Sequence, residues 1–260
     1  MKKLLKILLC LLVLSLIYAL VMYGYVWLKM RPLRPISNVF HTASWDQRPQ
    51  VHMVHAVNNI SRAKHKDALY EGFEIDLNRH NGQLIVAHDE TEFETAPSLE
   101  DILSAIKNPS QKTYWIDLKT FLTPQEVEHL ERIAARYKIN PRKMFFETTG
   151  GETALLLSKS SFPILLTVPA GFDKDNGDQQ KRELLNAELE NLIHQYHPFA
   201  IAASMGKYRY LQAYFPHYNK AIFSATTKRP SLKKYFLAKA MFKDPKVFIF
   251  MQEEHTFLPF

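Results

Sequence analysis

Eight short runs rich in β-branched and aromatic residues recur along the chain, and segments with helical periodicity separate them. The runs are residues 51–57, 73–78, 114–119, 144–148, 163–168, 200–204, 221–225 and 246–251. Regular alternation of strands and helices is typical of α/β folds, in which helices cover a parallel sheet. Eight units in about 225 residues predict a (β/α)₈ TIM barrel. A doubly wound sheet is the alternative, but no glycine-rich phosphate-binding turn follows the first run.

Turn and cap residues support these boundaries. Asn81-Gly82 is a strong hairpin signal, so residues 84–89 are expected to extend the second strand as a hairpin arm. Ser98 with Asp101 predicts the start of one helix, and Thr123 with Pro124 predicts the start of another. The chain stops nine residues after the eighth run, so no full final helix fits there. We expect residues 36–50 to cover that gap.

The amino-terminal segment predicts a membrane anchor. Residues 7–28 form a run of 22 positions without a charge, long enough as a helix to cross the bilayer core of roughly 30 Å. The run ends in Tyr23, Tyr25 and Trp27, a pattern typical of an interfacial aromatic belt and unlike a small-residue cleavage site. This favours a retained transmembrane helix over a cleaved signal. The chain is thus expected to comprise an anchor and linker, residues 1–35, and one barrel domain, residues 36–260.

The basic charge lies mainly in this anchor. The whole chain has a net charge of +7, and its first 34 residues carry six Lys and Arg and no acid. The remaining domain is nearly neutral, which disfavours a nucleic-acid-binding protein, because such proteins present a clustered basic face. The expected partner is a lipid bilayer. Basic residues flank the span on both sides, and we expect the amino terminus inside and the domain on the extracytoplasmic side. The sequence sets no oligomeric state.

Polar residues stand at the carboxyl ends of the first four expected strands, where buried parallel strands are normally apolar. They are His55, Glu74, Asp76, Asp117, Lys119 and Glu147. In a barrel this end of the sheet carries the active site. Glu74 and Asp76 are two residues apart on a strand and therefore share a face, and the same holds for Asp117 and Lys119.

Three inward carboxylates need a compensating cation, because burying an unpaired charge costs several kcal/mol. An all-oxygen set favours Mg²⁺, with Ca²⁺ as the alternative, over Zn²⁺. His55 and His88 would flank this set as proton donor and acceptor. Each motif has a simpler explanation, since an isolated Glu-x-Asp is usually a solvated face and Asp117 with Lys119 could be a structural ion pair. Their occurrence in order at successive strand ends favours a functional site.

Four blocks of the chain resemble the phospholipase-C-like phosphodiesterase superfamily of (β/α)₈ barrels. They are HAVNN at 55–59, EGFEIDL at 71–77, NGQLIVAHDE at 81–90 and WIDLKT at 115–120. Glycerophosphodiester phosphodiesterases of this superfamily have His-Arg-Gly after the first strand, whereas this chain has Ala56 and Val57 after His55. The sequence looks closer to the sphingomyelinase D-type branch, and its HAVN start is similar to menorin-type domains.

The resemblance implies a membrane-anchored phosphoric diester hydrolase acting on glycerophosphodiesters or phospholipid head groups. Glu74, Asp76 and Asp117 would hold one Mg²⁺, and His55 and His88 would serve as base and acid. Lys119 would contact the substrate phosphate, and a cyclic phosphate could form first if a substrate hydroxyl attacks. Asn58 and Glu147 are further candidate site residues. The chain lacks the Arg that would supply a bidentate contact to the phosphate of a glycerophosphodiester.

Two other functions remain open. The barrel could bind a lipid head group or a partner protein without turnover, and Asp117 with Glu147 could hydrolyse glycosides, although this leaves both histidines and Lys119 unused. Residues 228–246 contain seven basic residues and one acid, and are either a membrane-lying helix or, as we favour, a barrel helix with a solvated lysine face. Glu253 or Glu254 is expected at the barrel mouth.

Overall fold

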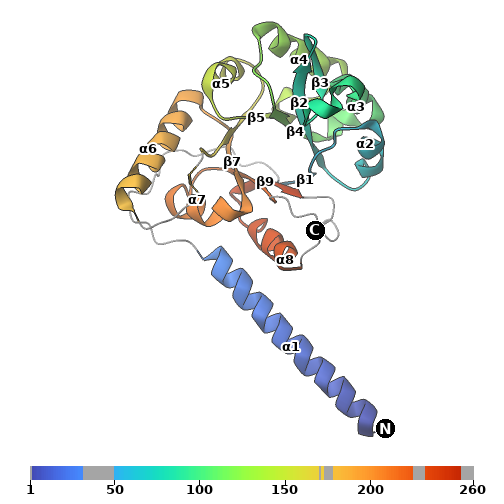
Figure 1. Cartoon of the computed structure of the whole chain (residues 1–260), viewed down its shortest axis with the longest axis vertical. Coiled ribbons are helices and arrows are strands. Elements are labelled where there is room, and N and C mark those ends of the chain that lie inside the picture. The colour runs from blue at the N-terminus through green and yellow to red at the C-terminus, as the bar shows by residue number, and fades with distance from the viewer. Residues whose placement is uncertain (1, 32–49, 170, 173–177, 225–231, 253–260) are drawn as a thin grey trace.

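The computed structural model describes residues 2–31, 50–169, 171–172, 178–224 and 232–252. Its centre is a closed barrel of eight parallel strands in the order β1, β2, β4, β5, β6, β7, β8 and β9, and β9 pairs back with β1 (Figure 1). A ninth strand, β3, pairs antiparallel with β2 outside the ring. The predicted TIM barrel is therefore confirmed, and the doubly wound alternative is excluded by the closure.

The strands are β1 (Val51–Val54), β2 (Gly72–His80), β3 (Gln83–Val86), β4 (Thr113–Leu118), β5 (Met144–Thr148), β6 (Ile164–Thr167), β7 (Ala200–Ser204), β8 (Lys220–Phe223) and β9 (Val247–Gln252). The α-helices are α1 (Lys2–Met30), α2 (Ile60–Lys66), α3 (Leu99–Ala105), α4 (Pro124–Arg136), α5 (Gly151–Ser158), α6 (Gln179–Tyr196), α7 (Tyr208–Tyr214) and α8 (Leu232–Met241). Short 3₁₀ helices span Glu90–Thr95, Pro109–Gln111, Pro141–Lys143 and Met205–Lys207.

The structure confirms the predicted hairpin turn and the two predicted helix starts. Asn81 and Gly82 both have positive φ, at 48° and 76°, and connect β2 to β3 in a tight hairpin. Ser98 and Thr123 accept hydrogen bonds from the backbone N–H three residues on, and Asp101 and Glu126 complete the two capping boxes. Local hydrogen bonding thus fixes where α3 and α4 begin.

Alternate residues on the strands face two different cores. Met53, Trp115, Phe145 and Leu165 belong to a small cluster with the alanines of β7 and β8, which fills the inside of the ring. Phe73, Ile75, Tyr114 and their equivalents on the other strands pack outward against the helices in a larger cluster. Because side chains on a strand alternate in direction, Glu74, Asp76 and Asp117 point to the same side as the inner cluster.

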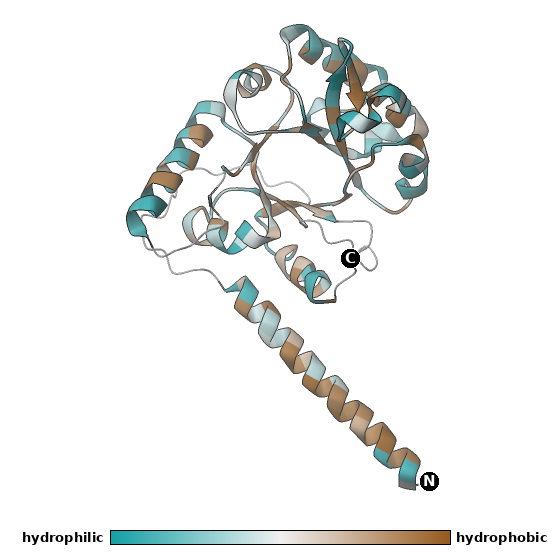
Figure 2. Ribbon diagram, in the orientation of Figure 1, coloured by the Kyte–Doolittle hydropathy of each residue, from teal (hydrophilic) through white to brown (hydrophobic). Residues whose placement is uncertain are grey.

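Helix α1 leaves the barrel as a single long rod that is apolar around its whole circumference (Figures 1 and 2). Residues 3–30 of this helix are long and apolar enough to cross a membrane. The free end is fully exposed, whereas the end nearer the barrel is in contact with it. Met22 is 5% exposed, and Tyr25 and Met30 pack against the outer core.

Several sequence predictions lie outside the described residues. The segment 36–50, expected to close the barrel after the eighth strand, is described at Gln50 alone. The side-chain amide of Gln50 donates to the carbonyls of Phe242, Asp244 and Val247, and so joins the start of β1 to the start of β9. Glu253 and Glu254 fall outside the described residues.

Candidate active site

Three carboxylates meet inside the barrel at the carboxyl ends of two neighbouring strands. Glu74 and Asp76 lie on β2, and Asp117 lies on β4, where it pairs in register with Asp76. One oxygen from each of the three groups lies within 4.8 Å of the others. Glu74 and Asp76 are each 1% exposed. The structure therefore brings together the three residues predicted from the Glu-x-Asp and Asp-x-Lys spacing.

This cluster concentrates negative charge where water is scarce. Burial and the neighbouring Asp76 carboxylate raise the pKa of Glu74 well above its usual range. The buried Oδ1 of Asp76 lies 3.0 Å from Lys119 Nζ but accepts no well-aligned hydrogen bond within the described residues. Clustered, under-satisfied carboxylate oxygens are the ligand set that hard divalent cations take. The donor set of Glu74, Asp76 and Asp117 thus fits a cation such as Mg²⁺ or Ca²⁺.

Asn58 fixes the orientation of Asp76. Its Nδ2 donates to Asp76 Oδ2 at 2.5 Å, and its Oδ1 accepts from the backbone N–H of Asp76 at 3.0 Å. Asn58 follows β1, so this two-point contact joins the first and second strands at the mouth. One Asp76 oxygen is therefore held by the amide, and the other faces the cluster.

His55 lies beside the carboxylates at the end of β1. Its Nε2 is 3.8 Å from Glu74 Oε2, and its side chain is 31% exposed. The backbone is held on both sides, because His55 N–H donates to Gln252 and Arg62 donates to the His55 carbonyl. The imidazole thus has both a carboxylate neighbour and access to the mouth.

The residue after His55 has an unusual conformation. Ala56 has φ of 55°, in the left-handed region, and its N–H donates to Glu74 Oε2. This φ is unfavourable for a residue with a Cβ atom. The turn therefore directs an amide donor at the buried Glu74 carboxylate.

Lys119 spans two of the three acids. Its Nζ lies 2.5 Å from Asp117 Oδ2 and 3.0 Å from Asp76 Oδ1. Burial alone would lower the pKa of Lys119, but attraction to Asp117 and Asp76 outweighs it, and the net shift is upward. Lys119 is therefore a cation at all physiological pH values and neutralises part of the cluster.

His88 stands at the edge of this group. The preceding residue, Ala87, donates its N–H to the carbonyl of Asp76, which places residue 88 just past the metal-ligand candidate. The side chain is 52% exposed, and its Nδ1 lies 3.0 Å from Asp89 Oδ1. The sequence predicts that His88 pairs with His55 as acid and base, and the structure shows an exposed His88 with Asp89 as its acidic neighbour.

Glu147 on β5 pairs in register with Asp117 and extends the row of acids. Trp115 Nε1–H donates to one of its oxygens at 2.8 Å, and Thr167 Oγ1–H donates to the other at 2.7 Å. Burial, and next the nearby Asp117 carboxylate, raise the pKa of Glu147 to about 7. Glu147 can therefore exchange a proton near neutral pH.

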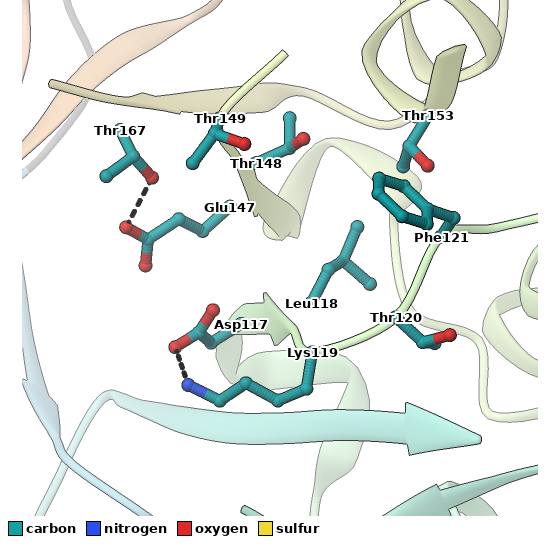
Figure 3. A pocket seen from close by; sticks show the side chains of 10 residues that line it. All are labelled: Asp117, Leu118, Lys119, Thr120, Phe121, Glu147, Thr148, Thr149, Thr153 and Thr167. Atoms are coloured by element: carbon teal, nitrogen blue, oxygen red, sulfur yellow. Dashed lines mark hydrogen bonds and ion pairs between the residues drawn. The ribbon is translucent and has the colours of Figure 1, made fainter. Parts of the chain in front are cut away.

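A cavity of about 330 Å³ opens next to these acids (Figure 3). Asp117, Lys119 and Glu147 line one part of it, and the rest is rich in threonine. The threonines that line it are Thr120, Thr148, Thr149, Thr153 and Thr167. Phe121, which is 78% exposed, lies at its rim. Sequence reasoning missed this threonine group, although the strand-end position of Thr148 and Thr149 beside Glu147 is a usable signal.

No protein-family model matches this sequence, and no curated protein sequence matches it. Solved structures do resemble it. A glycerophosphodiester phosphodiesterase from Parabacteroides distasonis is 13% identical, with a TM-score of 0.52 over 80% of this chain and 94% of that chain. An Oleispira antarctica phosphodiesterase in complex with the product sn-glycerol-3-phosphate is 9% identical, with a TM-score of 0.51 over 78% of this chain and 92% of that chain.

Enzymes of other chemistry also resemble the chain. N-(5'-phosphoribosyl)anthranilate isomerase from Pyrococcus furiosus is 7% identical, with a TM-score of 0.49 over 79% of this chain and 88% of that chain. Likeness at such low identity reports the path of the backbone, since one barrel fold carries many reactions. The two phosphodiesterase structures, at 13% and 9% identity, therefore show the TIM-barrel fold alone.

Proposed function

We propose that this protein is a membrane-anchored, metal-dependent phosphoric diester hydrolase. The observation that carries the proposal is the cluster of Glu74, Asp76 and Asp117 with Lys119, beside His55 at the barrel mouth. A divalent cation fits the three carboxylates, and a lysine and a histidine stand within reach of a ligand bound there. Phosphodiester cleavage uses all of these groups, whereas glycoside hydrolysis would use two carboxylates alone.

Each side chain has a distinct part in the proposed reaction. A bound Mg²⁺ or Ca²⁺ would neutralise charge on a phosphate oxygen. His55 takes the proton of the attacking water or substrate hydroxyl, and the Glu74 carboxylate 3.8 Å away stabilises the imidazolium that results. His88 protonates the leaving alkoxide from the rim. Lys119 supplies a positive charge to the phosphate, and Asn58 keeps Asp76 in place.

The threonine-lined cavity suits the alcohol part of the substrate. Hydroxyl groups both donate and accept hydrogen bonds, so they match the hydroxyls of glycerol or another polyol. Burial raises the pKa of Glu147 to about 7, so this carboxyl group is partly neutral near pH 7 and is a poor counter-ion for a quaternary ammonium. We therefore favour hydroxylated head groups over choline.

The test uses the purified full-length chain in detergent micelles. We expect hydrolysis of aryl and glycerol phosphodiesters that depends on added Mg²⁺, with phosphorus NMR identifying a phosphomonoester or a cyclic phosphate. The control is the double variant His55→Ala, Glu74→Ala. Turnover no greater than that of the control would refute the proposal, as would calorimetry that finds no divalent-cation site.

One observation supports a second function, a barrel that binds a phosphorylated head group without cleaving it. Lys119 lies 2.5 Å from Asp117 and already offsets part of the acidic charge, so the cluster is partly neutralised by the chain itself. In this case the full-length protein would bind glycerophosphodiesters and Mg²⁺ in calorimetry without forming product. The same experiment therefore separates the two functions.

The anchor also implies a topology. We propose that α1 spans the membrane with its amino terminus inside and the barrel on the extracytoplasmic side, as its length and composition allow. Reporter enzymes fused to the carboxyl terminus, one active outside the membrane and one inside, test this orientation. Activity of the inside reporter alone would reverse it.

A further inference from the structure

The end of α1 is packed against the flank of the barrel. Lys233 Nζ on α8 lies 5.7 Å from the centroid of the Tyr25 ring, and Arg209 Nε on α7 donates to the Arg31 carbonyl at 2.8 Å. Met22 is buried to 5% exposure in the same region. Helix α8 therefore lies beside the last turns of α1, below the ring of strands (Figure 1).

These contacts involve the mouth side of the barrel. Arg209 and Lys233 are each the second residue of their helix, α7 and α8. The opposite end of α8 is near the start of β9, because Gln50 binds both the Phe242 and Val247 carbonyls. The first turn of α8 is thus at the end of the barrel where the carboxylates lie, and the end of α1 is held there.

The outward face of α8 combines apolar and basic side chains. Leu232 and Phe236 are one helical turn apart and are each 42% exposed. Lys233 and Lys239 are exposed on the same helix, and exposed Lys243 follows it. Exposed leucine and phenylalanine side chains near lysines supply the apolar contacts and the positive charge with which a protein surface binds an anionic bilayer.

The packing of α8 on α1 and the exposed side chains of α8 support the same conclusion. Tyr23, Tyr25 and Trp27 mark the end of the apolar run in α1, and such aromatic residues sit at the level of lipid head groups. Since α8 packs on this part of α1, its exposed face is at the same level. A solvated lysine face would not require Leu232 and Phe236 to be exposed there.

We infer that α8 is a second membrane-binding element, whose exposed Leu232, Phe236 and Lys239, with Lys243 just after the helix, lie on the surface of an anionic phospholipid bilayer. This rests on the proposed anchoring of α1. Phe236 and Leu232 enter the head-group region, and the lysines bind lipid phosphates. The barrel is then held with the mouth-side ends of α7 and α8 at the membrane surface, close to lipid head groups.

The experiment measures depth in the membrane by spin labelling. The described part of the chain contains one cysteine, Cys10, and a Cys10→Ser background accepts single labels. Phe236→Cys and Leu232→Cys report on α8, Ile17→Cys on the span, and Leu184→Cys, on the exposed surface of α6, is the aqueous control. The full-length variants are reconstituted in phosphatidylcholine vesicles with or without phosphatidylglycerol, and label accessibility to oxygen and to a water-soluble nickel chelate is compared.

We expect the Ile17 label to be more accessible to oxygen and the Leu184 label to be more accessible to the chelate. The α8 labels should have intermediate accessibilities. Phosphatidylglycerol should increase the oxygen preference of the α8 labels, and Lys239→Gln with Lys243→Gln should remove that increase. If both α8 labels have the same accessibility as the Leu184 label while the Ile17 label lies in the bilayer, then α8 does not bind the membrane, although α1 still anchors the protein. If Ile17 favours the chelate, the anchor and the inference both fail. None of these readouts depends on hydrolase activity.

Discussion

Asn58 and Asp76 are joined by two hydrogen bonds, one to the carboxylate and one from the backbone, at 2.5 and 3.0 Å. Asp76 is buried, so its orientation depends on this amide. Replacing Asn58 with alanine should destabilise the fold by about 1 to 3 kcal/mol, the cost of leaving buried polar groups unpaired. It should also weaken Mg²⁺ binding by roughly 10- to 100-fold, as loss of groups that orient metal ligands commonly does.

Calorimetric Mg²⁺ titration and urea unfolding measure both effects. The neighbouring Asn59→Ala is a matched control, because Asn59 caps α2 by accepting from the Arg62 N–H. That variant should lose about 1 kcal/mol of stability and keep its Mg²⁺ affinity. Equal loss of affinity in the two variants would contradict the positioning role of Asn58.

Lys119→Met tests whether the lysine serves the phosphate or the metal-ligand set. Without the ammonium group, the acids repel one another, so the variant should be less stable in EDTA and gain more in Tm from Mg²⁺ than the wild type. Hydrolysis should fall by about 10²- to 10³-fold, the usual loss for one transition-state charge contact. Thermal unfolding with and without Mg²⁺, together with initial rates, gives both values. Unchanged hydrolysis would remove Lys119 from the mechanism.

Glu147 should make stability depend on pH. Its folded pKa, about 7, is above the usual value of 4.5, so the folded state holds the proton more tightly than the unfolded state. The stabilisation is complete below pH 4.5 and is lost as pH rises through 7. The free energy of unfolding of Glu147→Gln, relative to that of wild type, should therefore rise by roughly 1 to 2 kcal/mol from pH 5 to pH 8, after allowance for partial exposure.

Urea unfolding in EDTA at several pH values measures this difference. Glu152→Gln, at an exposed position on α5, is the comparison for loss of a glutamate elsewhere on the surface. A flat difference between Glu147→Gln and wild type across this range would show that Glu147 titrates normally.

The left-handed turn at Ala56 predicts different effects on stability for two small substitutions. Ala56→Gly should leave stability within about 1 kcal/mol of wild type, because glycine tolerates the φ of 55° but costs entropy. Ala56→Val should lose about 2 kcal/mol or more, since a β-branched residue is poorly accommodated there. Denaturant midpoints of the two variants measure these effects. If Ala56→Val were as stable as wild type, the turn would have to relax to another conformation.

The two histidines can be distinguished by the leaving group. With an alkyl diester, His55→Ala and His88→Ala should each lose about 10²- to 10⁴-fold in rate, as expected for loss of a general base or acid. A nitrophenyl leaving group needs no protonation, so His88→Ala should recover with that substrate and His55→Ala should not. Recovery of His55→Ala instead would exchange the two roles.

The barrel could be predicted because its signals are local and repeated. The run at 144–148 coincides with β5, and Asn81-Gly82 forms the expected hairpin. The short helices α2, α5 and α7 were less evident, since seven or eight residues give too few turns for a clear period. The cluster of Glu74, Asp76 and Asp117 followed from the two-residue period of strands, once barrel closure was assumed.

Other parts of the site depend on relationships that no sequence period encodes. The network of Trp115, Glu147 and Thr167 joins three strands, and its distances depend on the stagger of the barrel. The positive φ of Ala56 occurs at a residue that normally avoids it. The burial of Met22 was hidden inside a uniformly apolar run, because a membrane and a protein core select the same side chains there.

The packing of α1 on the barrel flank has a kinetic consequence. A domain on a free tether samples a hemisphere of solution, whereas one fixed beside its anchor moves mainly by lateral diffusion of the anchor. For the proposed membrane-anchored hydrolase, collisions with a lipid substrate would then be set by the mole fraction of that lipid in the leaflet. Inert lipid added at constant total substrate should slow the reaction, while diluting the vesicles in buffer should not, which is the surface-dilution behaviour of an interfacial catalyst.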